Sequence, residues 1–170
     1  MPYTDLLRAS VFVTAAEATA LGAITAVAAN REGEAWIVLV AGVWWLISLA
    51  IGLYLSRPAR AADDVRDALA RARTATSLPD QSPARIALTR LWPIAFTAIA
   101  AGVLGIFFPG VAAVGAGYAL IASLAWHTRE AAVLGIESRD GVKFYVVPSH
   151  PLRPIELVRT PGLRGDRLTV

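Results

Sequence analysis

One carboxylate lies inside a long apolar segment of this chain, and it is the strongest candidate for chemistry. Glu17 falls within residues 7–29. Counting from Leu7 at 1.5 Å per residue places it roughly 15 Å into a membrane. A charge at that depth costs about 2.5–3.5 kcal/mol on insertion scales, so Glu17 should face other helices or be protonated. Thr14 precedes it by nearly one helical turn and can reach the carboxyl group. The two residues together indicate an ion- or substrate-binding point, such as a proton or cation relay.

A structural role for Glu17 is the competing interpretation. A protonated carboxyl group can be hydrogen-bonded between helices, or an ionised one can pair with an inward-reaching Arg90 or Arg129. A transport path usually needs several polar groups, and the other apolar segments offer few: Thr97, Tyr118 and Ser123. We therefore favour the structural role.

Motifs of other chemistries are missing from the sequence. There are no cysteines, so no disulfide, thiol nucleophile or zinc–thiolate site can form. His127 and His150 each lack a second ligand at metal-binding spacing. No metalloprotease, nucleophile-elbow, Walker or dinucleotide-binding motif is present. We expect no catalytic residue, no metal, no cofactor and no enzymatic activity.

The elements that position these residues are predicted to be four transmembrane helices. Hydrophobic residues make up 56% of the chain and charged residues 17%, whereas soluble proteins average about 25% charged. The excess is gathered in four runs: 7–29, 35–55, 91–108 and 111–126. The first run ends in Ala26-Val27-Ala28, which resembles a signal-peptide cleavage site. Because Glu17 interrupts the run, we expect a retained helix instead.

The second run is the clearest predicted span. Its length corresponds to roughly 31 Å of helix, close to the hydrocarbon thickness of about 30 Å. Trp36 and Tyr54 lie near its two ends, where interfacial aromatic residues are common. Trp44 and Trp45 lie at its middle, and we expect their rings to be buried between helices.

The third and fourth runs are short and are predicted to form a helical hairpin around Pro109-Gly110. Ser82-Pro83 is a helix-start signal, so the third helix can begin well before Leu91. The fourth can continue through His127 toward Ala132. A re-entrant hairpin is the alternative, and Pro93 should kink the third helix or mark its entry.

The basic residues give the orientation. Four spans place the amino terminus, the 57–90 loop and the tail on one side. That side holds every one of the 16 Lys and Arg residues except Arg31. The positive-inside rule then predicts that both termini are cytoplasmic. Three arginines near span ends, Arg57, Arg60 and Arg129, are candidates for contact with lipid headgroups, as are the tail's Arg139, Lys143, Arg153 and Arg159.

The 57–90 loop is predicted to hold a helix over 61–76, with acidic residues early and basic residues late. Its apolar stripe is thin. The helix could lie on the membrane, dock the tail or contact a partner subunit, and we favour a solvated connecting helix.

The tail changes to strand-like alternation over Val142–Val147. The preceding Asp140-Gly141 is a hairpin signal, which makes Val133–Ser138 the candidate first strand and Ile155–Val158 a third. A tail this short lies near the lower limit for independent folding. It should therefore pack on the 57–90 loop, on another copy or on another protein.

The predicted fold is an all-α membrane protein: a bundle of four transmembrane helices with a cytoplasmic loop helix and a short β-rich tail. Residues 1–56 form the first two spans, 57–90 the loop, 91–132 the helical hairpin and 133–170 the tail. The abundance of arginine and alanine is typical of a protein encoded by a bacterial genome of high GC content. We expect a structural, accessory or scaffold component of the cytoplasmic membrane. Its partners would be the bilayer, anionic headgroups and a second copy or another protein, but not nucleic acid. The alternative is a small oligomeric transporter or channel that uses Glu17.

Overall fold

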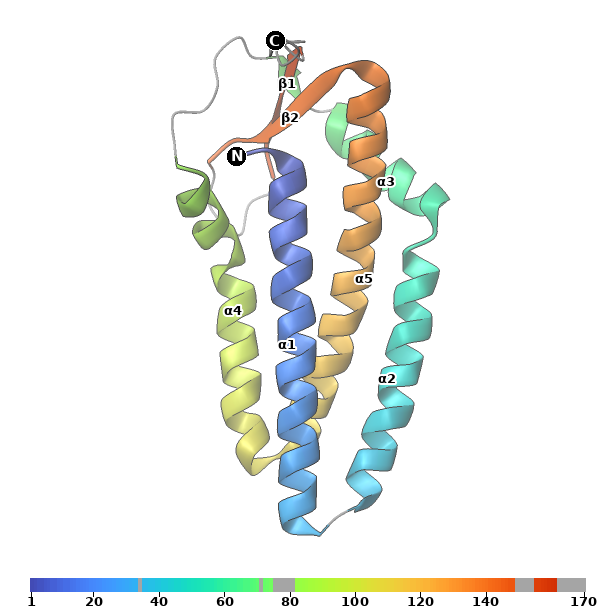
Figure 1. The fold of residues 1–170 in the computed structure, drawn as a ribbon, viewed down its shortest axis with the longest axis vertical. Coiled ribbons are helices and arrows are strands. Elements are labelled where there is room, and N and C mark those ends of the chain that lie inside the picture. The colour runs from blue at the N-terminus through green and yellow to red at the C-terminus, as the bar shows by residue number, and fades with distance from the viewer. Residues whose placement is uncertain (34, 71, 75–81, 149–154, 162–170) are drawn as a thin grey trace, which may run out of the picture.

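The structure is a computed structural model that describes residues 1–33, 35–70, 72–74, 82–148 and 155–161. Within them, four long helices dominate (Figure 1). The elements in chain order are α1 (Tyr3–Glu32), α2 (Ala35–Leu55), α3 (Pro58–Ala70), β1 (Arg73–Thr74), α4 (Pro83–Phe107), α5 (Pro109–Asp140), β2 (Val142–Val146) and β3 (Leu157–Pro161).

The helices α1, α2, α4 and α5 run alongside one another and are long and apolar enough to cross a membrane. Both the amino terminus and the β-sheet lie at one end of this bundle, together with α3, while the α1–α2 and α4–α5 turns lie at the other (Figure 1). We refer to these as the cap end and the short-loop end. The prediction of four long apolar helices is confirmed.

The third and fourth helices are longer than their apolar cores, as predicted. Pro83 occupies the first turn of α4, although Ser82 makes no side-chain capping hydrogen bond. Pro93 lies inside α4, which is helical on both sides of it. The 25 residues of α4 and the 32 of α5 favour two full spans over a re-entrant hairpin.

The carboxyl end of α5 contradicts the predicted first tail strand. Residues 133–138 are helical, and α5 continues to Asp140. The next residue, Gly141, has a φ of 63° and donates its N–H to the Glu137 carbonyl oxygen. Gly141 therefore acts as a left-handed helix cap and not as part of a hairpin turn. An Asp-Gly pair suits both structures, and the burial of Glu130 and Val133, one helical turn apart, favours the helix.

The loop helix is also displaced from its prediction. It covers Pro58–Ala70 instead of 61–76, and β1 follows at residues 73–74. β1 pairs in parallel with β3, with Arg73 opposite Val158. This long-range pairing, which no local propensity encodes, overrides the helical pattern.

The sheet has the order β1–β3–β2. β2 and β3 are antiparallel, with Val146 opposite Leu157 and Phe144 opposite Arg159. The strand predicted from Val142 is confirmed. The third strand begins at Leu157, two residues later than predicted. The amino terminus also joins β2, because the Val146 N–H donates to the Met1 carbonyl oxygen at 3.0 Å.

One hydrophobic core, which we call the cap core, unites the elements at this end. It consists of Tyr3, Leu6, Leu7, Val65, Leu69, Ile86, Val133, Val142, Phe144, Val146 and Leu157. The tail therefore packs on the 57–90 loop, which is one of the three arrangements predicted from the sequence. The prediction of a solvated connecting helix was wrong, because Val65 and Leu69 of α3 are only 2% and 8% exposed.

Packing between the long helices uses small side chains instead. α5 is central and lies along α1 and α2, and α1 also lies along α4. The core of this part consists of Leu21, Ala112 and Ala116. Large apolar side chains point outward, including Leu39 on α2, Phe96 on α4 and Val114 on α5.

Candidate functional site

Glu17 lies at the edge of the packed face of α1. Thr14, Ala18 and Leu21 of the same helix are buried, whereas Glu17 is half-exposed. Ile24, two helical turns after Glu17, packs over Gly102 and Gly105 of α4. Residues seven apart share one side of a helix, so Glu17 lies on the α4 side of α1.

The structure does not join Glu17 to Thr14. The Thr14 hydroxyl donates to the carbonyl oxygens of Ser10 and Val11, at 2.8 and 3.3 Å. In the described part of the chain, Glu17 takes part in no hydrogen bond or ion pair, including with Arg90 or Arg129. Among the described residues, the carboxyl group thus has no hydrogen-bonded or ion-paired partner that would form a relay with it.

The two central tryptophans attach α2 to α5. The indole N–H groups of Trp44 and Trp45 donate to the carbonyl oxygens of Val114 and Ala113, at 3.3 and 2.9 Å. Both rings are half-buried, in partial agreement with the expected burial. Their role is helix attachment, because a polar indole N–H inside a bundle requires an acceptor.

Four arginines from different segments lie in one zone toward the cap end of the bundle, about two helical turns deep. They are Arg8 on α1, Arg57 just after α2, Arg90 on α4 and Arg129 on α5. Counting 1.5 Å per residue from the short-loop end of each helix places them roughly 25–36 Å along the bundle axis. These distances from the short-loop end are close to the thickness of a hydrocarbon core, about 30 Å. We call this zone the arginine level.

Within this level, Arg8 pairs with Glu130 of α5. The Arg8 Nε donates to Glu130 Oε1 at 3.0 Å, and Glu130 is buried while Arg8 reaches outward. The pair fixes α1 against α5 at the base of the cap. Sequence reasoning missed Glu130. Its position beyond the apolar run, in a segment that can continue as a helix, was the available signal.

Arg57 and Arg60 meet at Tyr54. Their guanidinium carbons lie 4.6 and 4.7 Å from the centroid of the Tyr54 ring. Arg60 also donates from its terminal nitrogen to the Tyr54 hydroxyl at 3.3 Å. Arg129 belongs to another helix and is half-buried. Of the three candidates near span ends, the structure thus groups Arg57 and Arg60 and adds Tyr54 to them. The spacing of Tyr54, three and six residues before the two arginines, was a signal that the sequence offered.

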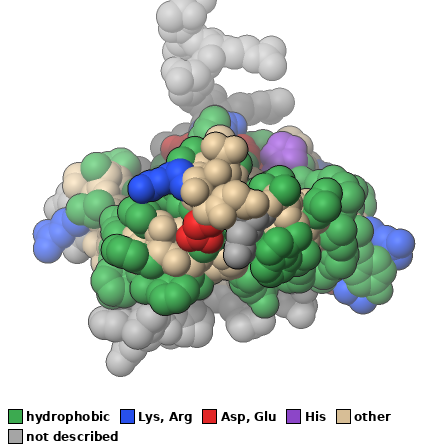
Figure 2. Space-filling model, turned by 90° about the horizontal axis from the view of Figure 1, so that it is seen from below, with side chains coloured by type: hydrophobic (Ala, Val, Ile, Leu, Met, Phe, Trp, Pro, Cys, Tyr) green, Lys and Arg blue, Asp and Glu red, His purple; other side chains and the backbone are tan. Residues whose placement is uncertain are grey.

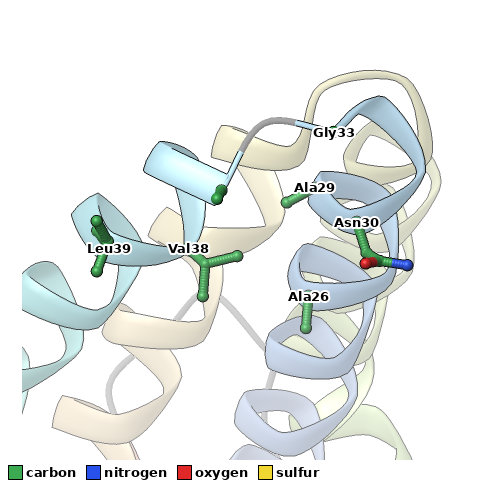
Figure 3. Close-up of a pocket in the computed structure, with 7 residues that line it drawn as sticks. Ala26, Ala29, Asn30, Gly33, Val38 and Leu39 are labelled. Carbon is green, nitrogen blue, oxygen red and sulfur yellow. The ribbon is translucent and has the colours of Figure 1, made fainter.

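The short-loop end differs in chemistry. Figure 2 shows it covered largely by hydrophobic side chains, with charged groups in a small area near the centre and at the rim. A groove of about 550 Å³ opens here between α1 and α2. Most of the lining that the structure describes is apolar, and Asn30, the polar side chain among these described residues, points away from Val38 (Figure 3).

The remaining candidates are dispersed. His127 is exposed on α5, and His150 lies outside the described residues. Among the residues that the structure describes, no group of three or more His, Asp or Glu side chains is placed to hold a metal ion. Comparison of this chain with protein-family models, with curated proteins and with solved structures found no match.

Proposed function

We propose that this protein is a multi-pass, non-enzymatic component of the cytoplasmic membrane that presents its cap in the cytoplasm as a structural, accessory or scaffold element. The observation that carries the proposal is the placement of large apolar side chains. Along α2 and α4 they face outward over the length of a hydrocarbon core, whereas at the cap end they are buried. A bilayer around the long helices and water around the cap would account for both.

The orientation is supported by the charges. Among the residues that the structure describes, every Lys and Arg except Arg31 lies in the cap or in the part of a long helix or its connection toward the cap. Positive charge on short loops and near span ends is retained on the cytoplasmic side.

The scaffold role is favoured by where the polar groups are available. Exposed Arg66, Lys143 and Arg159 are distributed over α3, β2 and β3 of the cap. Inside the bundle, the buried hydroxyls of Ser10, Thr14 and Thr25 donate to carbonyl oxygens of their own helix. The donors of these hydroxyls are therefore used within α1 itself.

The membrane placement can be tested by cysteine labelling, because the natural chain contains no cysteine. Glu32→Cys and Ser138→Cys introduce single exposed thiols at the short-loop end and the cap end. In intact cells, a membrane-impermeant maleimide should label the first variant only, and permeabilisation should expose both. The reverse pattern would overturn the orientation, and labelling of both in intact cells would overturn the spanning arrangement.

The scaffold role requires a partner that recognises the cap. Lys143→Glu combined with Arg159→Glu alters exposed cap residues while leaving the cap core intact. A specific protein that copurifies with the unaltered chain should be lost with this variant and retained with Arg31→Glu at the other end. Equal recovery with all three proteins, or no specific partner from native membranes, would contradict the scaffold role.

A further inference from the structure

We propose that Tyr54, Arg57 and Arg60 form a binding site for the phosphate group of an anionic membrane phospholipid. The inference rests on the proposed membrane placement and specifies which ligand the cytoplasmic boundary of α2 recognises.

The first argument is the convergence of two cations on one ring. Both guanidinium carbons lie within 4.7 Å of the Tyr54 centroid, and the hydroxyl of Tyr54 accepts a hydrogen bond from Arg60. Stacking on an aromatic ring restricts each guanidinium plane and leaves its edge N–H groups available. Two guanidinium groups held by the same ring can both act on one oxyanion, because each can donate two parallel hydrogen bonds to phosphate oxygens.

The second argument concerns the ion pairs of these two arginines. In the described part of the chain, no carboxylate forms an ion pair with Arg57 or Arg60. Elsewhere, Arg66 pairs with Asp63 at 3.3 Å and Arg139 with Asp140 at 2.8 Å. Two neighbouring like charges repel each other, so the pair at Tyr54 calls for an external anion.

The third argument is position. Tyr54 and both arginines are exposed, and they lie where the apolar surface of α2 ends at Leu55. α3 begins at Pro58, so its positive amino-terminal end lies beside the arginines. The buried stripe of α3 faces the cap core, which keeps α3 from covering the site. A headgroup phosphate lies at this depth, with its acyl chains along α2.

The test uses full-length protein in uncharged detergent micelles and phospholipids that carry a dansyl group on the acyl chain. Energy transfer from tryptophan reports binding of phosphatidylglycerol and, as the zwitterionic reference, phosphatidylcholine. Replacing both arginines by Gln should weaken phosphatidylglycerol binding roughly tenfold or more, because each basic group near a membrane surface contributes appreciably. Arg31→Gln with Arg66→Gln removes the same net charge and should change binding less than about twofold.

Further variants separate a built site from surface charge. Replacing both arginines by Lys keeps the charge but removes the planar forks, and it should weaken binding severalfold. Tyr54→Leu should also weaken it, because the ring no longer holds the guanidinium groups. Equal losses in the Gln pair and in the Arg31/Arg66 control would overturn the site.

Two further outcomes distinguish the source of the phosphate and the level of failure. Displacement by inorganic phosphate at concentrations comparable to the lipid would overturn the lipid assignment in favour of a soluble anion. Flotation with liposomes tests the membrane placement separately. Protein that floats but shows no preference for phosphatidylglycerol contradicts the site alone, whereas protein that does not insert contradicts the proposed function as well.

Discussion

Phenylalanine occupies opposite environments in two regions of this molecule. In the cap, Phe144 of β2 is 3% exposed and packs among residues of α1, α3, α4 and α5. At the short-loop end, Phe107 at the end of α4 is 68% exposed, and Phe96, about three helical turns earlier in α4, also faces outward. The buried positions of the long helices are occupied instead by small residues such as Ala112 and Ala116.

The difference teaches how one chain can be adapted to two solvents. Against water, burying large apolar side chains is the main source of stability, so the cap places them inside. Against lipid tails, an outward-facing Leu or Phe has no such penalty, and close backbone approach between helices becomes the available source of packing energy. The proposed bilayer boundary, at the arginine level, is where the first rule replaces the second.

The largest expected effect tests this contrast with one type of substitution. Phe144→Ala should lower the free energy of unfolding by about 3–5 kcal/mol, because it leaves a cavity in the cap core. Phe107→Ala should change it by less than about 1 kcal/mol in lipid nanodiscs, because no protein core surrounds that ring. Thermal unfolding with limited proteolysis of the cap measures both. A comparable loss for Phe107→Ala would show that another chain covers this surface.

The second prediction concerns close helix approach. A methyl group at Gly117 of α5 would overlap the Trp44 indole and the Ser48 hydroxyl of α2, whereas one at Gly42 would meet no atom within 4 Å. Gly117→Ala should therefore destabilise the bundle by about 1–3 kcal/mol. Gly42→Ala should be neutral or stabilise by up to about 1 kcal/mol, because alanine favours a helix. The unfolding temperature should fall for Gly117→Ala and should stay the same or rise for Gly42→Ala, and an equal fall in both variants would contradict the α2–α5 packing.

A third, smaller effect is expected at the arginine level. Arg8 and Glu130 have side chains that are 57% and 11% exposed, so the pair is partly screened by solvent. A double-mutant cycle with alanine at both positions should give a coupling energy of about 1 kcal/mol. The more exposed pair of Arg66 and Asp63, with side chains 64% and 75% exposed, provides the control and should give a value near zero. If both cycles gave zero, the Arg8–Glu130 pair would not fix α1 to α5.

The smallest effect is expected at Glu17. Because this carboxyl group has no hydrogen bond or ion pair in the described part of the chain, Glu17→Gln should alter stability by less than about 0.5 kcal/mol. Under the scaffold proposal, liposomes containing either protein should show no proton or cation flux above empty liposomes. Flux through the unaltered protein that Glu17→Gln abolishes, and that Glu32→Gln leaves intact, would support the transporter alternative and contradict the scaffold role.

The sequence by itself determined the four long helices and the strand at Val142. Both depend on local information, because a run of apolar residues or a period-two alternation is legible without knowing its neighbours. It also singled out Arg57 and Arg60 as candidates for headgroup contact, from their position after an apolar run, and that contact stays a prediction. No motif in the sequence identifies a ligand or a partner protein.

Only the tertiary structure decided the features that depend on distant segments. The extension of α5 through Val133–Ser138, the early end of α3 and the pairing of β1 with β3 all follow from the shared cap core. The same holds for the Arg8–Glu130 pair, whose members lie far apart in the chain. Local patterns at these places suit more than one structure, and burial against residues from elsewhere in the chain selects among them.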